Sequence, residues 1–140
     1  MTNIDFSKAI TAVQSLASAK EQIEEELAHL RWRAEVGGLV MEGGIVVRTD
    51  RETRAALTEA VNAIRAGLMQ GPVPWKMASG WADLAQEDLE AMTSAVARHV
   101  QNCFAAERTV QAQVDALENP AGFDPAAAFE AALNALETPT

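Results

Sequence analysis

The sequence is poor in the residues that most often carry covalent or electrostatic function. Its 140 residues include no tyrosine, one cysteine and 11 basic side chains against 20 acidic ones, so the net charge is −9 and the isoelectric point is near 4.6. The single cysteine, Cys103, excludes an internal disulfide, so packing alone must hold the fold. An acidic surface repels phosphate backbones and anionic lipids, which argues against nucleic-acid and membrane partners.

Long apolar runs and targeting signals are also missing. No stretch approaches the roughly 20 apolar residues that a membrane-spanning helix needs. The first five residues have no basic start, and no apolar core follows them as in a signal peptide. We therefore expect a protein that is made in the cytoplasm and has no membrane partner.

Motifs for catalysis are absent as well. The sequence has no phosphate-binding loop, dinucleotide-binding glycine motif, HExxH, CxxC or GxSxG. His29 and His99 lie far apart, and neither has a second histidine at metal-ligand spacing. We expect no enzyme activity, no cofactor and no metal. The alternative is an enzyme that uses Cys103 with His99, one helical turn earlier, but no oxyanion-hole loop or orienting residue accompanies them, and both have an ordinary structural interpretation.

What the sequence does contain is a long apolar repeat at its start. Residues 1–35 are predicted to form one helix, capped by Asn3 or Asp5, and to act as a coiled-coil assembly segment. Roughly 30 helical residues extend about 45 Å, which is more than a small domain can cover on one side. The helix should therefore project or pair with another chain, although packing within its own subunit is the alternative. The predicted interface residues here are Phe6, Val13, Leu16, Ile23, Leu27 and Leu30, and Lys20 falls at a core position of the repeat.

Residues 36–118 are predicted to alternate hairpins and helices. Gly37 and Gly38 end the first helix; strands 39–41 and 45–47 flank a turn at 42–44. Thr49 and Asp50 open a capping box for a helix over 51–69. A second hairpin over 74–84 turns at Ser79-Gly80, and a long helix spans 86–118. The residues expected to have structural roles are Thr49, Asp50, Trp75 and Trp81, which would clamp the second hairpin onto the helices, His99 and Cys103.

Residues 119–140 are predicted to form a linker and a short helix that starts at Asp124-Pro125. Phe129 and Leu133 give that helix a narrow apolar edge, which needs a partner surface and adds both residues to the predicted interface. The fold class expected for the whole chain is mainly α with small β-hairpins (α+β). Its order is long helix, hairpin, helix, hairpin, long helix and short C-terminal helix.

Several ordered motifs carry a resemblance to a known family. They are RWRAEVGGLVMEGGIVVRTDRETRAAL, PWKMASGWADLAQEDLEAM and AVARHVQNCFAAERTV. Together they resemble a domain of unknown function in tail-associated proteins of tailed bacteriophages, over residues 31 to about 117. One departure is Ala85, where the family often has a threonine or serine that caps the last helix. The motif positions that match are Thr49, Asp50, Trp75, Lys76, His99, Val100, Cys103, Phe104 and Glu107.

The resemblance implies a structural component of a tailed-phage virion, in the tail, a tail fibre or the host-adsorption apparatus. Such a protein would be made in the host bacterial cytoplasm and would act through self-assembly and contacts with other tail or fibre proteins. A homo-oligomer is expected, with a trimer favoured because fibres are commonly threefold. The alternative function is a non-virion chaperone for tail or tail-fibre assembly.

Overall fold

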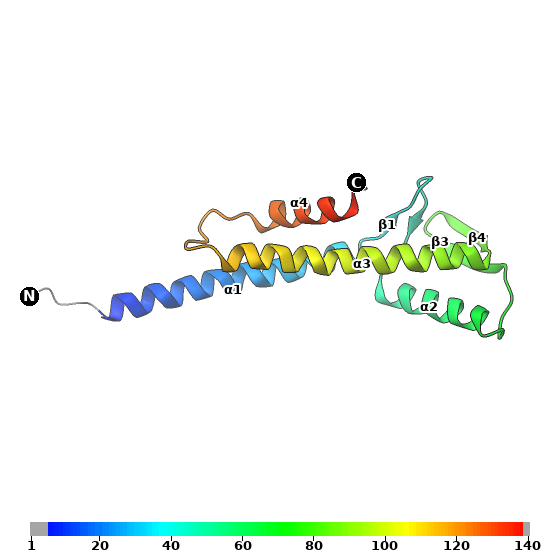
Figure 1. The fold of residues 1–140 in the computed structure, drawn as a ribbon, viewed down its shortest axis with the longest axis horizontal. Coiled ribbons are helices and arrows are strands. Elements are labelled where there is room, and N and C mark those ends of the chain that lie inside the picture. The colour runs from blue at the N-terminus through cyan, green and yellow to red at the C-terminus, as the bar shows by residue number, and fades with distance from the viewer. Residues whose placement is uncertain (1–5, 139–140) are drawn as a thin grey trace, which may run out of the picture. The chain divides into compact units, whose positions relative to one another are not determined.

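The computed structural model of the chain describes residues 6–138, and Figure 1 shows its helices and hairpins. The predicted fold class and element order are confirmed, while the predicted caps Asn3 and Asp5 lie outside the described residues. The elements are α1 (Phe6–Val36), β1 (Leu39–Val40), β2 (Val46–Val47), α2 (Arg51–Arg65), β3 (Val73–Met77), β4 (Gly80–Leu84), α3 (Gln86–Asp115) and α4 (Pro125–Glu137).

The chain divides into two compact units. The central unit is Trp32–Phe104, and the terminal unit combines the described residues up to Arg31 with those from Ala105 onward. These units do not follow the predicted segments 1–35, 36–118 and 119–140, because α1 and α3 each contribute residues to both units.

The end of α1 is set by two glycines. A Cβ at Gly37 would lie 2.7 Å from the carbonyl oxygen of Arg33, and Gly38 has a φ of +95°, which side chains disfavour. The hairpin that follows pairs Leu39 with Val47 and Val40 with Val46. Its strands are shorter than predicted, but the turn lies at residues 42–44 as expected.

The start of α2 differs from the predicted capping box. Asp50, not Thr49, is the N-cap, since its Oδ2 accepts from the Thr53 N–H at 3.1 Å and its Oδ1 from the Thr53 hydroxyl at 2.6 Å. Both hydrogen bonds lower the pKa of Asp50, and the bond from the Thr53 hydroxyl has the larger effect. Thr49 is fully buried, and its Oγ1 accepts from the Gly38 N–H at 2.9 Å. Thr49 therefore ties the segment after α1 to the segment before α2.

The end of α2 comes at Arg65, four residues before the predicted Met69. Gly67 has a φ of +75°, its N–H donates to the Ile64 carbonyl, and the Leu68 N–H donates to the Ala63 carbonyl. This is the Schellman arrangement, which ends a helix at a glycine. The long helix α3 is likewise shorter than predicted and stops at Asp115 rather than Glu118.

The second hairpin spans Val73–Leu84, close to the predicted 74–84, and turns at residues 78–79 rather than at Ser79-Gly80. Its two tryptophans differ in burial. Trp75 is half-buried against the core, whereas 73% of Trp81 is exposed, so the expectation that both rings clamp the hairpin is wrong for Trp81. Trp75 pairs with Ala82, and Trp81 pairs with Lys76, the next pair along the two strands. Because successive pairs of a hairpin face opposite sides, the two rings lie on opposite sides of it. The buried core of the central unit is Val47, Leu57, Ala60, Val61, Leu84, Leu89, Met92 and Val96.

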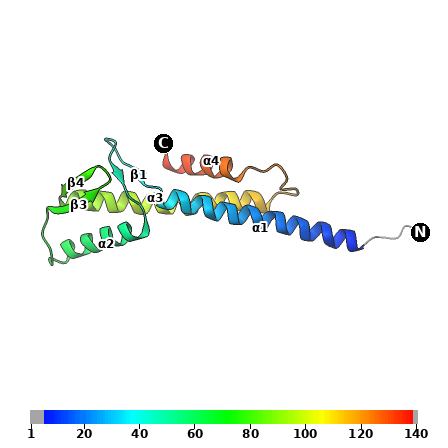
Figure 2. The same cartoon turned by 180° about the vertical axis from the view of Figure 1, so that it is seen from behind.

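In the terminal unit, α1 and the end of α3 run antiparallel. Lys20 Nζ donates to the Asp115 carbonyl oxygen at 3.2 Å, and Arg31 Nε donates to Glu107 Oε2 at 3.0 Å. Figure 2 shows the same arrangement from behind, with α4 alongside the C-terminal part of α3. The predicted start of α4 is confirmed: Asp124 accepts from the Ala127 N–H at 3.1 Å, and Pro125 is in the first turn. The buried apolar side chains here are Leu27, Ala106, Val110, Val114, Pro120, Pro125 and Phe129.

Candidate interaction sites

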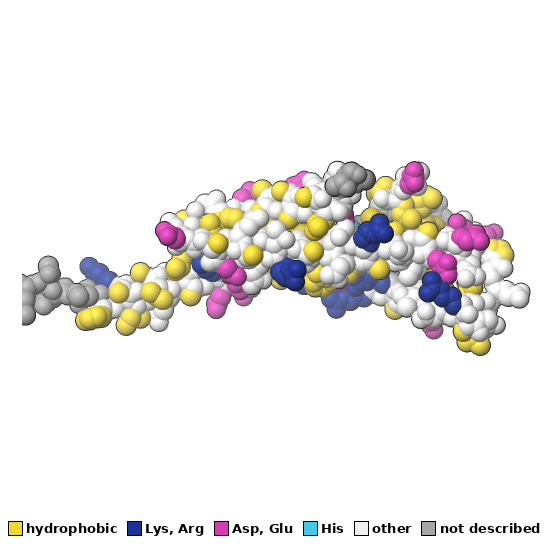
Figure 3. Space-filling model, in the orientation of Figure 1, with side chains coloured by type: hydrophobic (Ala, Val, Ile, Leu, Met, Phe, Trp, Pro, Cys, Tyr) yellow, Lys and Arg dark blue, Asp and Glu magenta, His cyan; other side chains and the backbone are white. Residues whose placement is uncertain are grey.

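The first part of α1 presents an uncovered apolar stripe, which we call the α1 face. At 100° per residue its four large side chains fall within about a third of the helix circumference. Figure 3 shows hydrophobic side chains gathered over this part of the terminal unit. The exposed fractions are 70% for Phe6, 58% for Ile10, 66% for Val13 and 36% for Leu16.

The exposure of this stripe follows from the length of α3. Since Arg31 pairs with Glu107 and Lys20 with the last residue of α3, Asp115, the helix α3 ends level with Lys20. Residues of α1 before Lys20 therefore extend past the end of α3. Leu27 lies within the paired stretch and is 1% exposed.

The predicted interface residues accordingly fall into different classes. Phe6, Val13 and Leu16 are exposed, whereas Ile23, Leu30 and Leu133 are partly buried. Leu27 and Phe129 are buried within their own subunit, so the prediction that they contact another chain is wrong for this fold. The same heptad pattern thus continues from a covered stretch into an uncovered one.

A groove continues the α1 face within the terminal unit. It has a volume of about 580 Å³ and lies between the side of α1 and the loop that follows α3. Leu16 belongs to both the α1 face and this groove. The lining residues are Ala12, Ser15, Leu16, Ala19, Gln22, Ile23, Glu26, Asn119, Pro120, Ala121 and Phe123.

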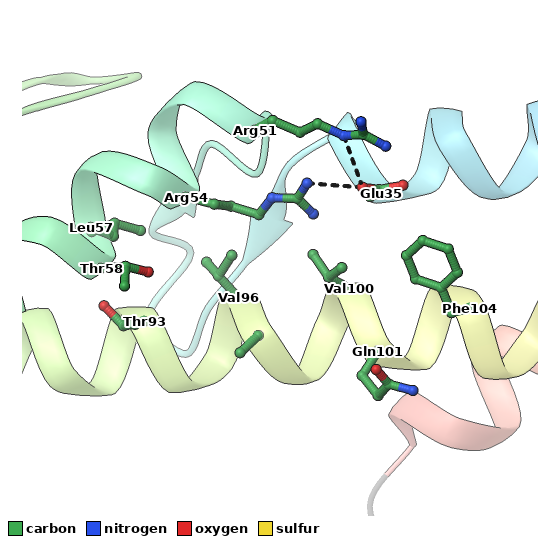
Figure 4. Close-up of a pocket in the computed structure, with 11 residues that line it drawn as sticks. Glu35, Arg51, Arg54, Leu57, Thr58, Thr93, Val96, Val100, Gln101 and Phe104 are labelled. Atoms are coloured by element: carbon green, nitrogen blue, oxygen red, sulfur yellow. Dashed lines mark hydrogen bonds and ion pairs between the residues drawn. The ribbon is translucent and has the colours of Figure 1, made fainter.

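The central unit holds a separate cavity of about 380 Å³, which we call the Glu35 cavity. Figure 4 shows its walls: the last turn of α1 supplies Glu35, α2 supplies Arg51 above it and Arg54 beside it, and α3 runs along the opposite side. The lining residues are Glu35, Arg51, Arg54, Leu57, Thr58, Thr93, Val96, Ala97, Val100, Gln101 and Phe104.

The electrostatics of this cavity centre on a buried carboxylate. The Glu35 side chain is 2% exposed, and its Oε1 accepts from Arg54 Nη2 at 2.9 Å and lies 3.6 Å from Arg51 Nε. A charge so far from water needs such partners, because its desolvation is costly. Arg54 is itself only 20% exposed, and its second terminal nitrogen, Nη1, is buried with no hydrogen-bond acceptor among the described residues.

His99 and Cys103 lie on one side of α3 within the central unit. His99 Nε2 is 3.0 Å from the Ala34 carbonyl oxygen, and since a carbonyl only accepts, this nitrogen carries the proton. Cys103 Sγ is 3.7 Å from the same nitrogen, so the imidazole does not offer it a free lone pair there. Both side chains are buried, and the hydrogen bond of His99 joins α3 to the end of α1.

Metal and membrane sites do not emerge from the described residues. In residues 6–138 no three His, Cys, Asp or Glu side chains gather closely enough to hold a metal ion. Nor does any helix in this part of the chain combine the length and apolar character needed to cross a bilayer.

Comparison with known proteins identifies one family. Residues 18–133 match the family described as domain of unknown function (DUF4376), and this segment is more than half of the chain. The chain belongs to this family. The resemblance to a domain of unknown function is thereby confirmed, over a longer segment than residues 31 to about 117. No curated protein and no solved structure matches the chain.

The two candidate sites differ in whether they lie within the residues that match DUF4376. The Glu35 cavity lies wholly inside the matched residues, whereas Phe6, Ile10, Val13 and Leu16 precede them. Heptad spacing in the sequence predicts the α1 face. Glu35 and Arg54 carry little such signal, because they are 19 positions apart and meet only through the tertiary fold. An acidic residue between Ala34 and Val36, just before two glycines, is the only local hint.

A carboxylate takes the place of the threonine or serine that the motif resemblance predicts at Ala85. Ala85 precedes α3 and has no side chain that could cap it. Instead Asp88 Oδ2 accepts from the Ala85 N–H at 3.0 Å, which is the reciprocal half of a capping box. The helix start therefore keeps one of the two capping interactions.

Proposed function

We propose that this protein is a structural component of a tailed-phage virion, in the tail, a tail fibre or the host-adsorption apparatus. It acts by contact rather than by catalysis, through self-assembly and through binding to other tail or fibre proteins. Its place is the tail of the particle, and it is made in the cytoplasm of the host bacterium. The phage assignment is supported by the motif resemblance, and the mode of action by the α1 face.

The observation that carries the mode of action is the uncovered apolar stripe on α1. Phe6, Ile10, Val13 and Leu16 follow helical spacing, and all are exposed in the isolated chain. Full burial of such a side chain contributes about 1.5–3 kcal/mol. A stripe of four therefore favours association, and its heptad spacing suits coiled-coil pairing between copies. A trimer is favoured because fibres are commonly threefold.

Val13→Asp tests the association directly. The substitution places a charge in the centre of the α1 face, so light scattering should report a monomer where the unchanged protein is an oligomer. Thr11→Asp is the matched control, because it adds the same charge on the opposite side of the same exposed helix turn. A monomeric unchanged protein, or an oligomer that survives Val13→Asp, would contradict the proposal.

The alternative is a non-virion chaperone for tail or fibre assembly. Its grounds are the acidity of the chain and an apolar helix edge at Phe129 and Leu133, but Phe129 is only 5% exposed. This burial favours the structural component. A mass-spectrometric inventory of purified particles separates the two, because a chaperone would be absent and a structural component present at a fixed copy number.

A further inference from the structure

The Glu35 cavity combines an unpaired donor with an apolar wall. Arg54 Nη1 has no acceptor among the described residues, although it sits on a guanidinium whose other end is bonded to Glu35. Buried donors are almost always paired, so an orphan at a cavity is a sign that an acceptor is missing. We propose that the cavity binds a small monocarboxylate with an apolar body, whose carboxylate accepts from Arg54.

The charge of the site favours a ligand that carries one negative charge. Two guanidinium groups lie within 4 Å of one carboxylate, so Arg51, Arg54 and Glu35 together carry a formal charge of +1. A monocarboxylate balances it. A dianion such as phosphate would leave a negative charge close to Glu35, in a protein whose net charge is already −9.

The apolar side chains that line the cavity favour a ligand with an apolar body. In Figure 4 Val96, Val100 and Phe104 project from α3 toward the side on which Arg54 and Glu35 lie, and Leu57 belongs to α2. A volume of about 380 Å³ is within the range of small-molecule sites, roughly 300–1,000 Å³. A short aliphatic or aromatic body therefore fits beside α3 while the carboxylate meets Arg54, whose side chain lies above Val100 in this view.

The proposal is independent of assembly through the α1 face. Every residue of the Glu35 cavity belongs to the central unit, whereas the α1 face belongs to the terminal unit. Loss of oligomerisation in Val13→Asp should leave carboxylate binding unchanged. The two proposals can therefore fail separately.

The test is titration of the full chain with hexanoate, followed by ¹H–¹⁵N NMR. Saturable shifts are expected at amides around the Glu35 cavity, such as Val100 and Gln101. Hexanamide has the same body without the charge, and it should bind about tenfold more weakly or worse, because a charge-assisted hydrogen bond is lost. Equal affinity for the acid and the amide, shifts that map elsewhere, or no saturable shift would overturn the proposal.

Two variants locate the binding. Arg54→Lys keeps the positive charge beside Glu35 but has no second nitrogen, so hexanoate should bind several-fold more weakly while hexanamide is unaffected. Ala97→Leu narrows the cavity from an exposed position on α3 and does not touch the ion pair. This variant should bind both hexanoate and hexanamide more weakly. If Arg54→Lys does not fold, an unchanged hexanoate affinity in Ala97→Leu overturns the proposal by itself.

Discussion

The two parts of α1 carry the same apolar repeat, but its side chains are buried or partly buried in the later part and exposed in the earlier part. Leu27, in the later part, is 1% exposed, while Val13, two heptads earlier at the same repeat position, is 66% exposed. The helix is continuous through both. What differs is the neighbour, because α3 accompanies α1 only as far as Lys20. A periodic sequence therefore tells which side of a helix is apolar, but not what covers it.

This comparison changes how the association of the protein should be tested. A deletion of residues 1–30 would remove Leu27 together with the α1 face, and so would confuse unfolding with loss of assembly. A cut after Leu16 removes only the exposed part. The predictions below start with the position where the two parts should differ most.

Leu27→Asp should have the largest effect on stability. It places a carboxylate where the side chain is 1% exposed, beside the buried end of α3. Leucine truncation in a core costs about 2–5 kcal/mol, and an unpaired buried charge adds to that. At chain concentrations low enough to keep the protein monomeric, we expect a loss of more than about 4 kcal/mol in urea denaturation, against less than about 0.5 kcal/mol for Val13→Asp. Similar losses in both variants would show that the two parts of α1 are equally covered.

Trp75→Ala extends the comparison to the central unit. Trp75 is partly buried against the core, so its removal should cost about 2 kcal/mol, below the roughly 3–5 kcal/mol typical of a fully buried ring. Trp81, on the opposite side of the same hairpin, is the matched control. Its replacement by alanine should change the free energy of unfolding by less than about 0.5 kcal/mol. Thermal denaturation of the two variants measures the difference, and a larger effect for Trp81 would contradict the assignment of faces.

Asp50→Ala should cost about 1 kcal/mol at neutral pH, since it removes the N-cap of α2. The hydrogen bonds from Thr53 lower the pKa of Asp50 in the folded protein. The stabilisation is therefore complete above the unfolded pKa of about 3.9 and is lost as the pH falls through the lower folded value. Urea denaturation at pH 7 and near pH 3 should show a difference between the variant and the unchanged protein that shrinks at the lower pH. A constant difference would exclude the ionised carboxylate as its source.

Lys20→Ala should have the smallest effect and marks the boundary between the two parts of α1. Its ammonium group donates to the last carbonyl of α3, where a cation also favours the helix dipole. Because this contact is exposed, we expect a loss of about 0.5 kcal/mol or less. The loss should diminish in high salt. A loss comparable to that of Leu27→Asp would mean that the covered stretch extends further toward the N-terminus.

The success of sequence reasoning depended on how local each feature is. The Asp124-Pro125 start of α4 and the glycines that end α1 were predicted, because a helix cap needs only a few neighbouring residues. The capping role expected of Thr49 fell to Asp50 because Thr49 is held by Gly38, 11 residues earlier in the chain. The α1 face was predicted from its spacing, but Leu27 and Phe129 were placed on the wrong side of the boundary between exposed and buried residues.

The sequence by itself determined the helices, the hairpin turns and the apolar stripe of α1, since each depends on spacing and backbone preference within a few residues. Only the tertiary structure decided that α3 stops beside Lys20 and that Glu35 meets Arg54. Both outcomes depend on where distant segments end and pack. Burial and ion pairing are properties of that arrangement, and no single segment contains them.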